Sequence, residues 1–271
     1  MSKSRKALMK LIYIALFTAL CFVGTMIFIP IGTSKMHLGN LFCILAGLLC
    51  GGWVGGIAGA LGMGLNDIVF GYPYTVYVRT FILKFLMGFI SGTLFRALIK
   101  HHVKGNLLLY ITSSLLSALY IYIVVCYCNA VKGFTLTLLI VSSILEGLLL
   151  FLSVFSFKLD NILKCLSFSM LVSLSVNVIG EFYLRILFNT ILGMTYEEAK
   201  LTSVAALPGS FFTSLITIVI LLPTFYPIYR ATRIINVFND LEEYMPQRSL
   251  ERSKPEDTKK KEPIHTSLKN E

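Results

Sequence analysis

Long apolar runs dominate the pattern of hydrophobic and polar positions along the chain. Six of them are Leu8–Ile29, Tyr77–Ile99, Leu107–Cys128, Phe134–Phe157, Leu163–Leu192 and Ala205–Tyr229. Each is longer than the roughly 18 residues that indicate a membrane-spanning helix. None shows the strict alternation of a transmembrane β-strand. The pattern therefore predicts an all-α polytopic membrane protein.

The first run, Leu8–Ile29, begins among four cationic residues, Lys3, Arg5, Lys6 and Lys10, a pattern that signal peptides share with first membrane helices. It is 22 residues long, which exceeds the apolar region of about 7–15 residues in a signal peptide; it also ends next to Pro30 and lacks a small-residue cleavage site. We therefore expect a retained first helix.

The glycine-rich stretch His37–Phe70 is too long for one membrane span and short for two. Two short helices turning at Gly51-Gly52-Trp53, with the N-terminus inside, put most later cationic residues in the cytoplasm, as the positive-inside rule requires. These residues are Arg96, Lys100, Lys104, Lys158, Lys164, Arg230 and Arg233. A single span would move all of them outside. We therefore expect two helices here, about eight membrane segments in all, and cytoplasmic N- and C-termini.

The composition agrees with a membrane protein and excludes an ordinary soluble enzyme. Charged residues make up 14% of the 271 residues, against roughly 25% in an average soluble domain. The formal net charge is +10, but residues 231–271 hold eight cationic and eight acidic residues. The excess of positive charge therefore lies in residues 1–230, mostly at the ends of the predicted spans, where it sets the orientation of the protein in the membrane. This position argues against a nucleic-acid partner.

The last part of the chain differs in composition from the rest. From about Asn236 the residues are mostly polar, and they include three prolines. Such a segment cannot bury enough apolar surface to fold alone. We expect a transmembrane domain over residues 1–235 and a disordered cytoplasmic tail over residues 236–271.

Small residues recur at helical spacing in two places. Gly47, Gly51, Gly55 and Gly59 are four residues apart, and Gly88-x-x-x-Gly92 follows further on. Small faces of this kind let helix backbones approach closely in lipid, so we expect them to pack inside the bundle. Ala15-x-x-x-Ala19 forms a similar ridge on the first helix.

Polar and ionisable side chains inside the apolar runs are candidates for function, because they are costly at membrane depth. They include Asn66, Asp67, Arg79, Lys84, Asn177, Glu181 and Arg185. The last three are spaced i, i+4, i+8, which predicts one shared helix face. Two structural alternatives stay open: an ion pair of Glu181 with Arg185 that only relieves burial, and an Asp67 that caps a helix or pairs with Arg79.

Motifs of catalysis and nucleotide binding are absent from the sequence. It contains no HExxH, GxSxG or Walker-A motif, so neither an intramembrane hydrolase nor an ATP-binding engine is indicated. The six cysteines have no metal-ligand spacing and are interpreted as buried thiols. We expect no enzymatic activity, no metal site and no cofactor.

The order of several motifs resembles that of a known family. The motifs are Ala15-x-x-x-Ala19, His37-Leu38-Gly39-Asn40, the glycine-rich run 48–62, Asn66-Asp67, Gly71-Tyr72-Pro73-Tyr74, Lys84-Phe85-Leu86-Met87-Gly88, Asn177-Val178-Ile179-Gly180-Glu181-Phe182 and Ala206-Leu207-Pro208-Gly209. They are similar to the substrate-binding S components of energy-coupling-factor (ECF) vitamin transporters, specifically the riboflavin-type group. The resemblance covers about residues 1–99 and 165–230.

The middle of the chain departs from this family, whose S components are compact six-helix bundles. The runs Leu107–Cys128 and Phe134–Phe157 are additional. We interpret residues 107–157 as an inserted transmembrane hairpin, which preserves sidedness because two spans return the chain to the same face. A second departure is Glu181, where the family often has tyrosine, so the identity of the substrate is not carried over.

The resemblance implies a transport subunit in the cytoplasmic membrane of a bacterium, surrounded by membrane lipid. Such a subunit binds a vitamin outside, docks onto a membrane coupling subunit driven by two cytoplasmic ATPases, and topples to release the vitamin inside. Ala15 and Ala19 would belong to the docking surface. A mainly apolar pocket would lie near the outer face, beside the loop after the first helix. Its expected ligand-binding residues are Asn40, Asn66, Asp67, Tyr72, Tyr74, Lys84, Asn177 and Glu181.

Other functions stay open at the level of the sequence. A self-sufficient secondary transporter or channel is the main alternative, although such transporters usually have paired broken helices in two repeats. Only one glycine-rich broken region, residues 47–64, is present. A scaffold or an enzyme is a further alternative. The ligand can be a flavin, a pyridoxine-like compound, a pyrimidine or another small vitamin.

Overall fold

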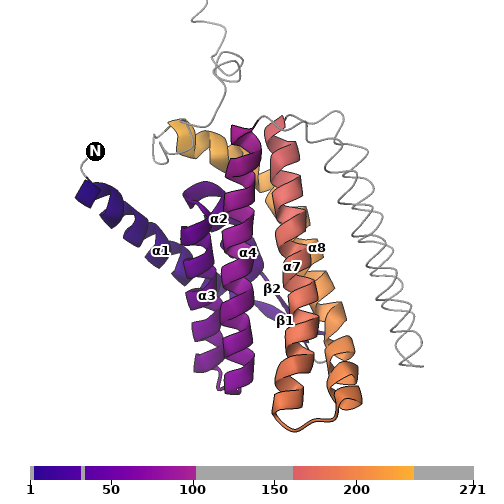
Figure 1. Cartoon of the computed structure of the whole chain (residues 1–271). Coiled ribbons are helices and arrows are strands. Elements are labelled where there is room, and N and C mark those ends of the chain that lie inside the picture. Colours follow the sequence, from indigo (N-terminus) through magenta and orange to yellow (C-terminus); the bar gives the residue numbers. More distant parts are fainter. Residues whose placement is uncertain (1–2, 32–33, 102–160, 235–271) are drawn as a thin grey trace, which may run out of the picture.

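The computed structural model describes residues 3–31, 34–101 and 161–234 (Figure 1). The elements, labelled as in Figure 1, are α1 (Lys3–Met26), β1 (Phe28–Ile31), β2 (Ser34–His37), α2 (Gly39–Cys50), α3 (Gly52–Val69), α4 (Tyr74–Lys100), α7 (Asn161–Ile191) and α8 (Tyr196–Ile234). The predicted hairpin over residues 107–157 and the predicted tail over residues 236–271 lie outside the described residues. Both stay predictions.

Four helices of the described part are long and apolar enough to cross a membrane. They comprise Ala7–Met26, Tyr74–Lys100, Ile162–Ile191 and Tyr196–Phe225. The mostly helical fold with these helices supports a multi-pass membrane protein. The start of α1, the end of α4, the start of α7 and the end of α8 lie at the same end of the bundle (Figure 1).

The stretch that was ambiguous in the sequence forms two helices, α2 and α3, as predicted. Gly51 separates them with a φ of 104°, a backbone conformation that glycine adopts without steric cost. Helix α2 has 12 residues and is therefore about 18 Å long. That length is short of the roughly 30 Å hydrocarbon core of a bilayer.

Close glycine contacts hold α2, α3 and α4 together, as predicted. A Cβ atom on Gly47 would collide with the backbone oxygen of Gly88, and one on Gly55 would collide with the backbone of Gly47. A Cβ atom on Gly92 would collide with the backbone oxygen of Gly47. The three backbones therefore approach more closely than larger residues would allow.

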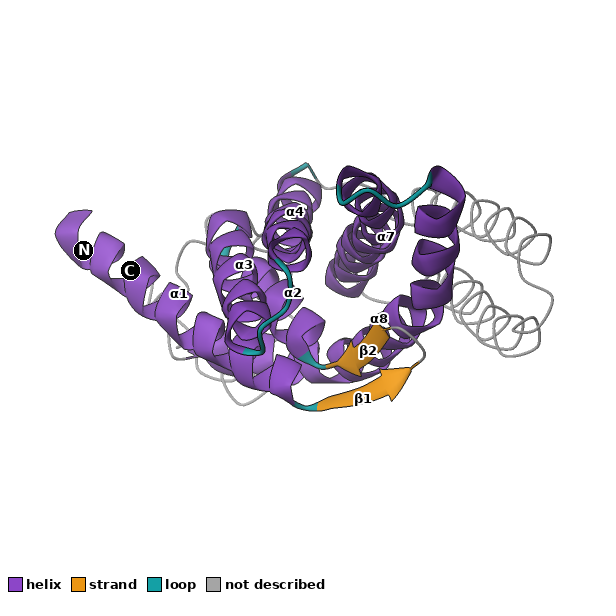
Figure 2. Cartoon of the chain, turned by 90° about the horizontal axis from the view of Figure 1, so that it is seen from below, coloured by secondary structure: helices purple, strands orange, loops and turns teal. Residues whose placement is uncertain are grey.

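The mostly helical fold is consistent with the predicted all-α class, and a two-stranded antiparallel hairpin that was not predicted lies between α1 and α2. Its register pairs Phe28 with His37 and Ile31 with Ser34. The Thr213 hydroxyl of α8 donates to the Lys35 backbone oxygen over 3.4 Å. Seen from below, the hairpin bridges from the end of α1 to α8, across the space bordered by α3, α4 and α7 (Figure 2).

Helix α8 begins nine residues before the predicted position, Ala205. A capping box explains this early start: the Thr195 backbone N–H donates to Glu198 Oε2 over 3.0 Å, and the Glu198 N–H donates to Thr195 Oγ1 over 3.4 Å. These two bonds satisfy N–H groups that have no partner within the helix.

The N-terminal part of helix α1 leans away from the other helices (Figure 1), whereas Phe17 and Cys21 further along it are buried. Both Ala15 and Ala19 are exposed on it. Among the described cysteines, Cys21, Cys43 and Cys165 are buried and free, while Cys50 is free and partly buried. The expectation of buried thiols therefore holds for three of these four.

Candidate functional site

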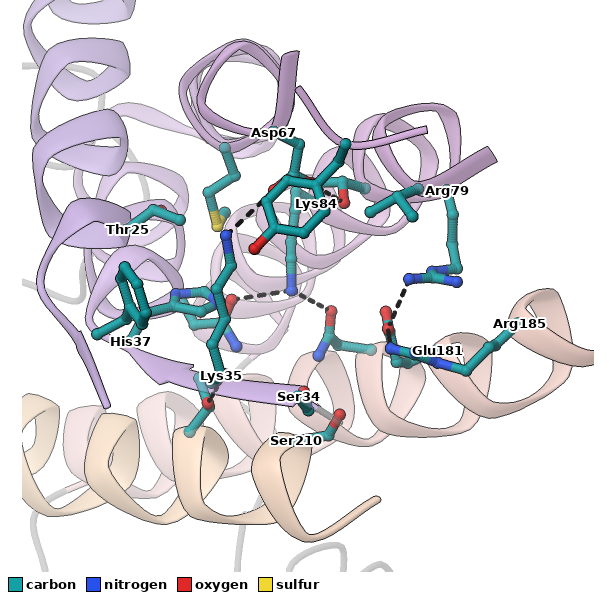
Figure 3. A pocket seen from close by; sticks show the side chains of 18 of the residues that line it. Thr25, Ser34, Lys35, His37, Asp67, Arg79, Lys84, Glu181, Arg185 and Ser210 are labelled. Carbon is teal, nitrogen blue, oxygen red and sulfur yellow. Dashed lines mark hydrogen bonds and ion pairs between the residues drawn. The ribbon is translucent and has the colours of Figure 1, made fainter. Parts of the chain in front are cut away.

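A cavity of about 340 Å³ lies between the hairpin, the end of α1 and the helices α2, α3, α4, α7 and α8 (Figure 3). Its volume falls in the lower part of the range for small-molecule sites. The lining residues are Thr25, Phe28, Pro30, Ser34, Lys35, His37, Asn40, Met63, Asp67, Tyr72, Val76, Arg79, Thr80, Lys84, Asn177, Glu181, Arg185, Ser210 and Thr213.

The lining carries more charged and polar residues than the few that were expected. Phe28, Pro30, Met63 and Val76 are its apolar residues, and Tyr72 adds an aromatic ring. The reason is that the hairpin and α4 contribute charged side chains in addition to those of α7.

Lys84 lies at the centre of the cavity wall. Its ammonium donates to Asn40 Oδ1 over 3.0 Å and to Asn177 Oδ1 over 2.7 Å (Figure 3). The side chain is ten residues into α4 from Tyr74, which places it about 15 Å along the helix. Lys84 therefore marks the deep part of the site, well away from the turn that precedes α4.

The predicted polar face of α7 is confirmed, because Asn177, Glu181 and Arg185 all line the cavity. Glu181 Oε1 accepts from Arg185 at 2.7 Å and lies 3.2 Å from an Arg79 nitrogen (Figure 3). The ion pair of Glu181 with Arg185 is thus present, and it lies at the cavity. Pairing and facing the pocket are therefore not alternatives.

Asp67 joins α3 to the hairpin and to α4. Its Oδ1 lies 3.3 Å from Lys35 Nζ, and its Oδ2 accepts a 2.6 Å hydrogen bond from the Thr80 hydroxyl. No ion pair of Asp67 with Arg79 occurs within the described residues, where Arg79 pairs with Glu181 instead. Lys35 Nζ also lies 4.8 Å from the centre of the Tyr72 ring.

Two of the eight predicted ligand-binding residues do not line the cavity. The Asn66 side chain donates to the Phe22 backbone oxygen over 3.5 Å, and Tyr74 is 54% exposed at the start of α4. The six predicted residues on the lining are Asn40, Asp67, Tyr72, Lys84, Asn177 and Glu181.

Several lining residues were not among the predicted site residues. Lys35 and His37 belong to the hairpin, which was not predicted. Arg79 was noted as an ionisable residue within an apolar run but was not placed in the site. The helical spacing of its neighbours on α4 indicates that it faces the cavity. Val76, Thr80 and Lys84 are spaced i, i+4, i+8 on α4, and Arg79 is one residue from this face.

Two further features of the site concern charge and metals. The Gly39 N–H donates to His37 Nδ1 over 3.2 Å, so this nitrogen carries no proton and the ring is neutral. Within the described residues, no group of three or more His, Cys, Asp or Glu side chains is arranged to hold a metal ion.

Comparison with known proteins gives a family match. The family described as ECF-type riboflavin transporter, S component, matches residues 6–144, just over half of the chain. The matched range covers most of α1 and all of α2, α3 and α4, and it ends before α7 and α8. Searches of curated proteins and of solved structures gave no match. By the family match, the chain belongs to the ECF-type riboflavin transporter S component family.

Proposed function

We propose that this chain binds a vitamin or vitamin precursor, riboflavin or another small heterocycle, for ATP-driven import by partner subunits. The observation that carries the proposal is the cavity of about 340 Å³ that is lined by the hairpin and by residues of six helices. A polar chamber inside a bundle of membrane helices is suited to capturing one small molecule. The family of the chain supports the same function.

The lining offers groups that orient a flat ligand. Lys35 Nζ lies 5.9 Å from the Phe28 ring centre and 4.8 Å from the Tyr72 ring centre, so two aromatic side chains flank one cation at the hairpin side. Aromatic faces stack on heterocycles. Asn40, Lys84 and Asn177 supply hydrogen bonds at the deep end of the cavity.

Energy for import comes, in this proposal, from a membrane coupling subunit and two cytoplasmic ATPases. Supporting this division of labour, the sequence holds no nucleotide-binding motif. The exposed Ala15 and Ala19 on α1 form a ridge of small side chains that helices of the coupling subunit can approach closely. The proposed location is the cytoplasmic membrane of a bacterium.

Uptake of labelled riboflavin into cells tests the proposal. The full chain is expressed with the coupling subunit and both ATPases, with ATPases inactivated in their nucleotide sites, or alone. We expect uptake only with active ATPases. Equal uptake by the chain alone would instead establish a self-sufficient transporter or channel. Mass spectrometry of small molecules that co-purify with the chain identifies a ligand other than riboflavin.

A further inference from the structure

The charges that line the cavity do not balance. The lining holds four cationic side chains, Lys35, Arg79, Lys84 and Arg185, and two carboxylates, Asp67 and Glu181. Lys35 pairs with Asp67, while Arg79 and Arg185 share one oxygen of Glu181. With His37 neutral, the described lining carries an excess of two positive charges.

Lys84 is the cation whose charge is least compensated. Its side chain is buried, at 7% exposure, and it forms no ion pair within the described ranges. Its two partners there are the neutral amide oxygens of Asn40 and Asn177. A lysine ammonium has three N–H donors, so one of them is left for another acceptor. A buried charge without a counter-charge is costly, and a bound anion would remove that cost.

The amide groups around Lys84 also present donors. Because an ammonium only donates, Asn40 and Asn177 must turn their oxygens towards it, and their NH₂ groups then face away from it. Neither NH₂ group donates a hydrogen bond within the described part of the chain. The buried Nε atoms of Arg79 and Arg185 have no acceptor among the described residues either. The site thus holds several donors for which the described residues supply no acceptor.

We infer that the ligand of this cavity carries an anionic oxygen group, a carboxylate or a phosphate, which binds at Lys84 between Asn40 and Asn177. The inference rests on the proposed function, because it names the substrate class of the same cavity. An anionic group supplies both the missing counter-charge and the missing acceptors. Riboflavin itself is neutral, so it supplies acceptors but no counter-charge. An anionic ligand adds Coulomb attraction to these hydrogen bonds, and this attraction is stronger in a buried site than in water, which favours the anionic ligand.

Binding of matched neutral and anionic probes tests the inference. The pairs are riboflavin with riboflavin 5′-phosphate, uracil with orotate, and nicotinamide with nicotinate; the first adds a phosphate and the other two present a carboxylate. Dissociation constants are measured by titration calorimetry on the full chain in detergent. In at least one pair we expect the anionic member to bind about ten- to a hundredfold more tightly than the neutral member. Which pair responds distinguishes phosphate from carboxylate.

Two variants and a control assign this preference to Lys84. Lys84→Met removes the cation and should abolish the preference. Asn177→Asp puts a carboxylate at the position of an amide oxygen that lies 2.7 Å from the Lys84 ammonium. This variant should bind the anionic probe at least tenfold more weakly, and the melting temperature of the protein without ligand should rise. Lys10→Met, at an exposed position of α1, should change neither the binding of the anionic probe nor the melting temperature.

The outcomes separate this inference from the proposed function. Equal or tighter binding of every neutral member overturns the inference and leaves the proposed function standing. The inference is also overturned if the Lys84→Met variant still prefers the anionic member of a pair. If none of the three anionic probes binds, the inference is also overturned. The proposed function is then still tested separately by ATPase-dependent uptake. If Lys84→Met does not fold, Asn177→Asp decides: unchanged binding of the anion overturns the inference.

Discussion

The Lys84 ammonium donates a 2.7 Å hydrogen bond to the Asn177 side-chain oxygen and so joins two residues that are 93 positions apart. Lys84 lies on α4 and Asn177 on α7. The second bond of Lys84, to Asn40 at 3.0 Å, adds α2. One buried cation therefore links three helices at the wall of the cavity. A ligand that binds this cation stabilises the assembled bundle, by about 2.7 kcal/mol at a hundredfold excess over its dissociation constant.

Reporter fusions check the membrane orientation. Fusions after Lys104, Lys164 and Arg233 should all report a cytoplasmic position, since cationic residues favour the cytoplasmic side. A fusion at Lys132 should report an external position, because it falls between the two runs of the predicted hairpin. An external signal at Lys104 would contradict the cytoplasmic N-terminus. A cytoplasmic signal at Lys132 would remove the inserted hairpin.

The glycine contact between α3 and α4 makes a prediction about stability. In Gly88→Ala the new Cβ atom would collide with the backbone of Gly55 and Gly56, which cannot move without separating the helices. We expect the free energy of unfolding to fall by about 1–3 kcal/mol, the usual cost of overpacking. Thermal melting in detergent measures this change.

Gly180→Ala is the matched control for Gly88→Ala. Its Cβ atom would meet the end of the flexible Leu83 side chain, which can adopt another rotamer. Alanine also favours a helix over glycine by about 1 kcal/mol. Gly180→Ala should therefore leave the melting temperature unchanged or raise it. An equal fall in melting temperature in both variants would show that the backbone contact at Gly88 is not the cause of the destabilisation.

The helices were predictable because their signals are local. Apolar length and cationic ends reveal α1, α4 and α7, and Gly51 marks the turn between α2 and α3. The hairpin was not predictable in the same way. Phe28-Ile29-Pro30-Ile31 continues the apolar run of α1, and four-residue strands are too short for alternation to be informative.

The candidate site was predictable only where one helix carries several polar residues. Asn177, Glu181 and Arg185 are close in sequence, so their shared face follows from helical spacing. The pairing of Lys35 with Asp67 spans 32 residues and depends on how the hairpin folds back. Such long-range contacts leave no local periodicity in the sequence.

The exposed small ridge on α1 makes a prediction about transport. Ala15→Trp combined with Ala19→Trp should abolish ATPase-dependent uptake, because two indoles hold the coupling subunit away from α1. Ligand affinity in detergent should stay within about threefold, or less than 1 kcal/mol, since neither residue lines the cavity. Uptake and affinity are measured on the same variant.

Leu16→Trp provides the control on the same helix. Leu16 is 53% exposed, and it points about 100° away from Ala15 around the helix axis. It adds the same bulky side chain at a different angle, so uptake should persist. Loss of ligand binding in the double variant, with assembly retained, would assign Ala15 and Ala19 a packing role instead.

The last prediction concerns Glu181, the carboxylate shared by two arginines. Glu181→Gln keeps the shape but leaves Arg79 and Arg185 without their counter-charge. Removing one partner of a buried ion pair costs about 3–5 kcal/mol; because the Glu181 side chain is 17% exposed, we expect the free energy of unfolding to fall by about 2–3 kcal/mol. The affinity for an anionic probe should not fall, since the lining becomes more positive. Glu197→Gln, at a side chain 80% exposed and 4.0 Å from Lys200, should leave the melting temperature unchanged. A Glu181→Gln protein that melts like the unsubstituted one would show that the two arginines do not depend on this carboxylate.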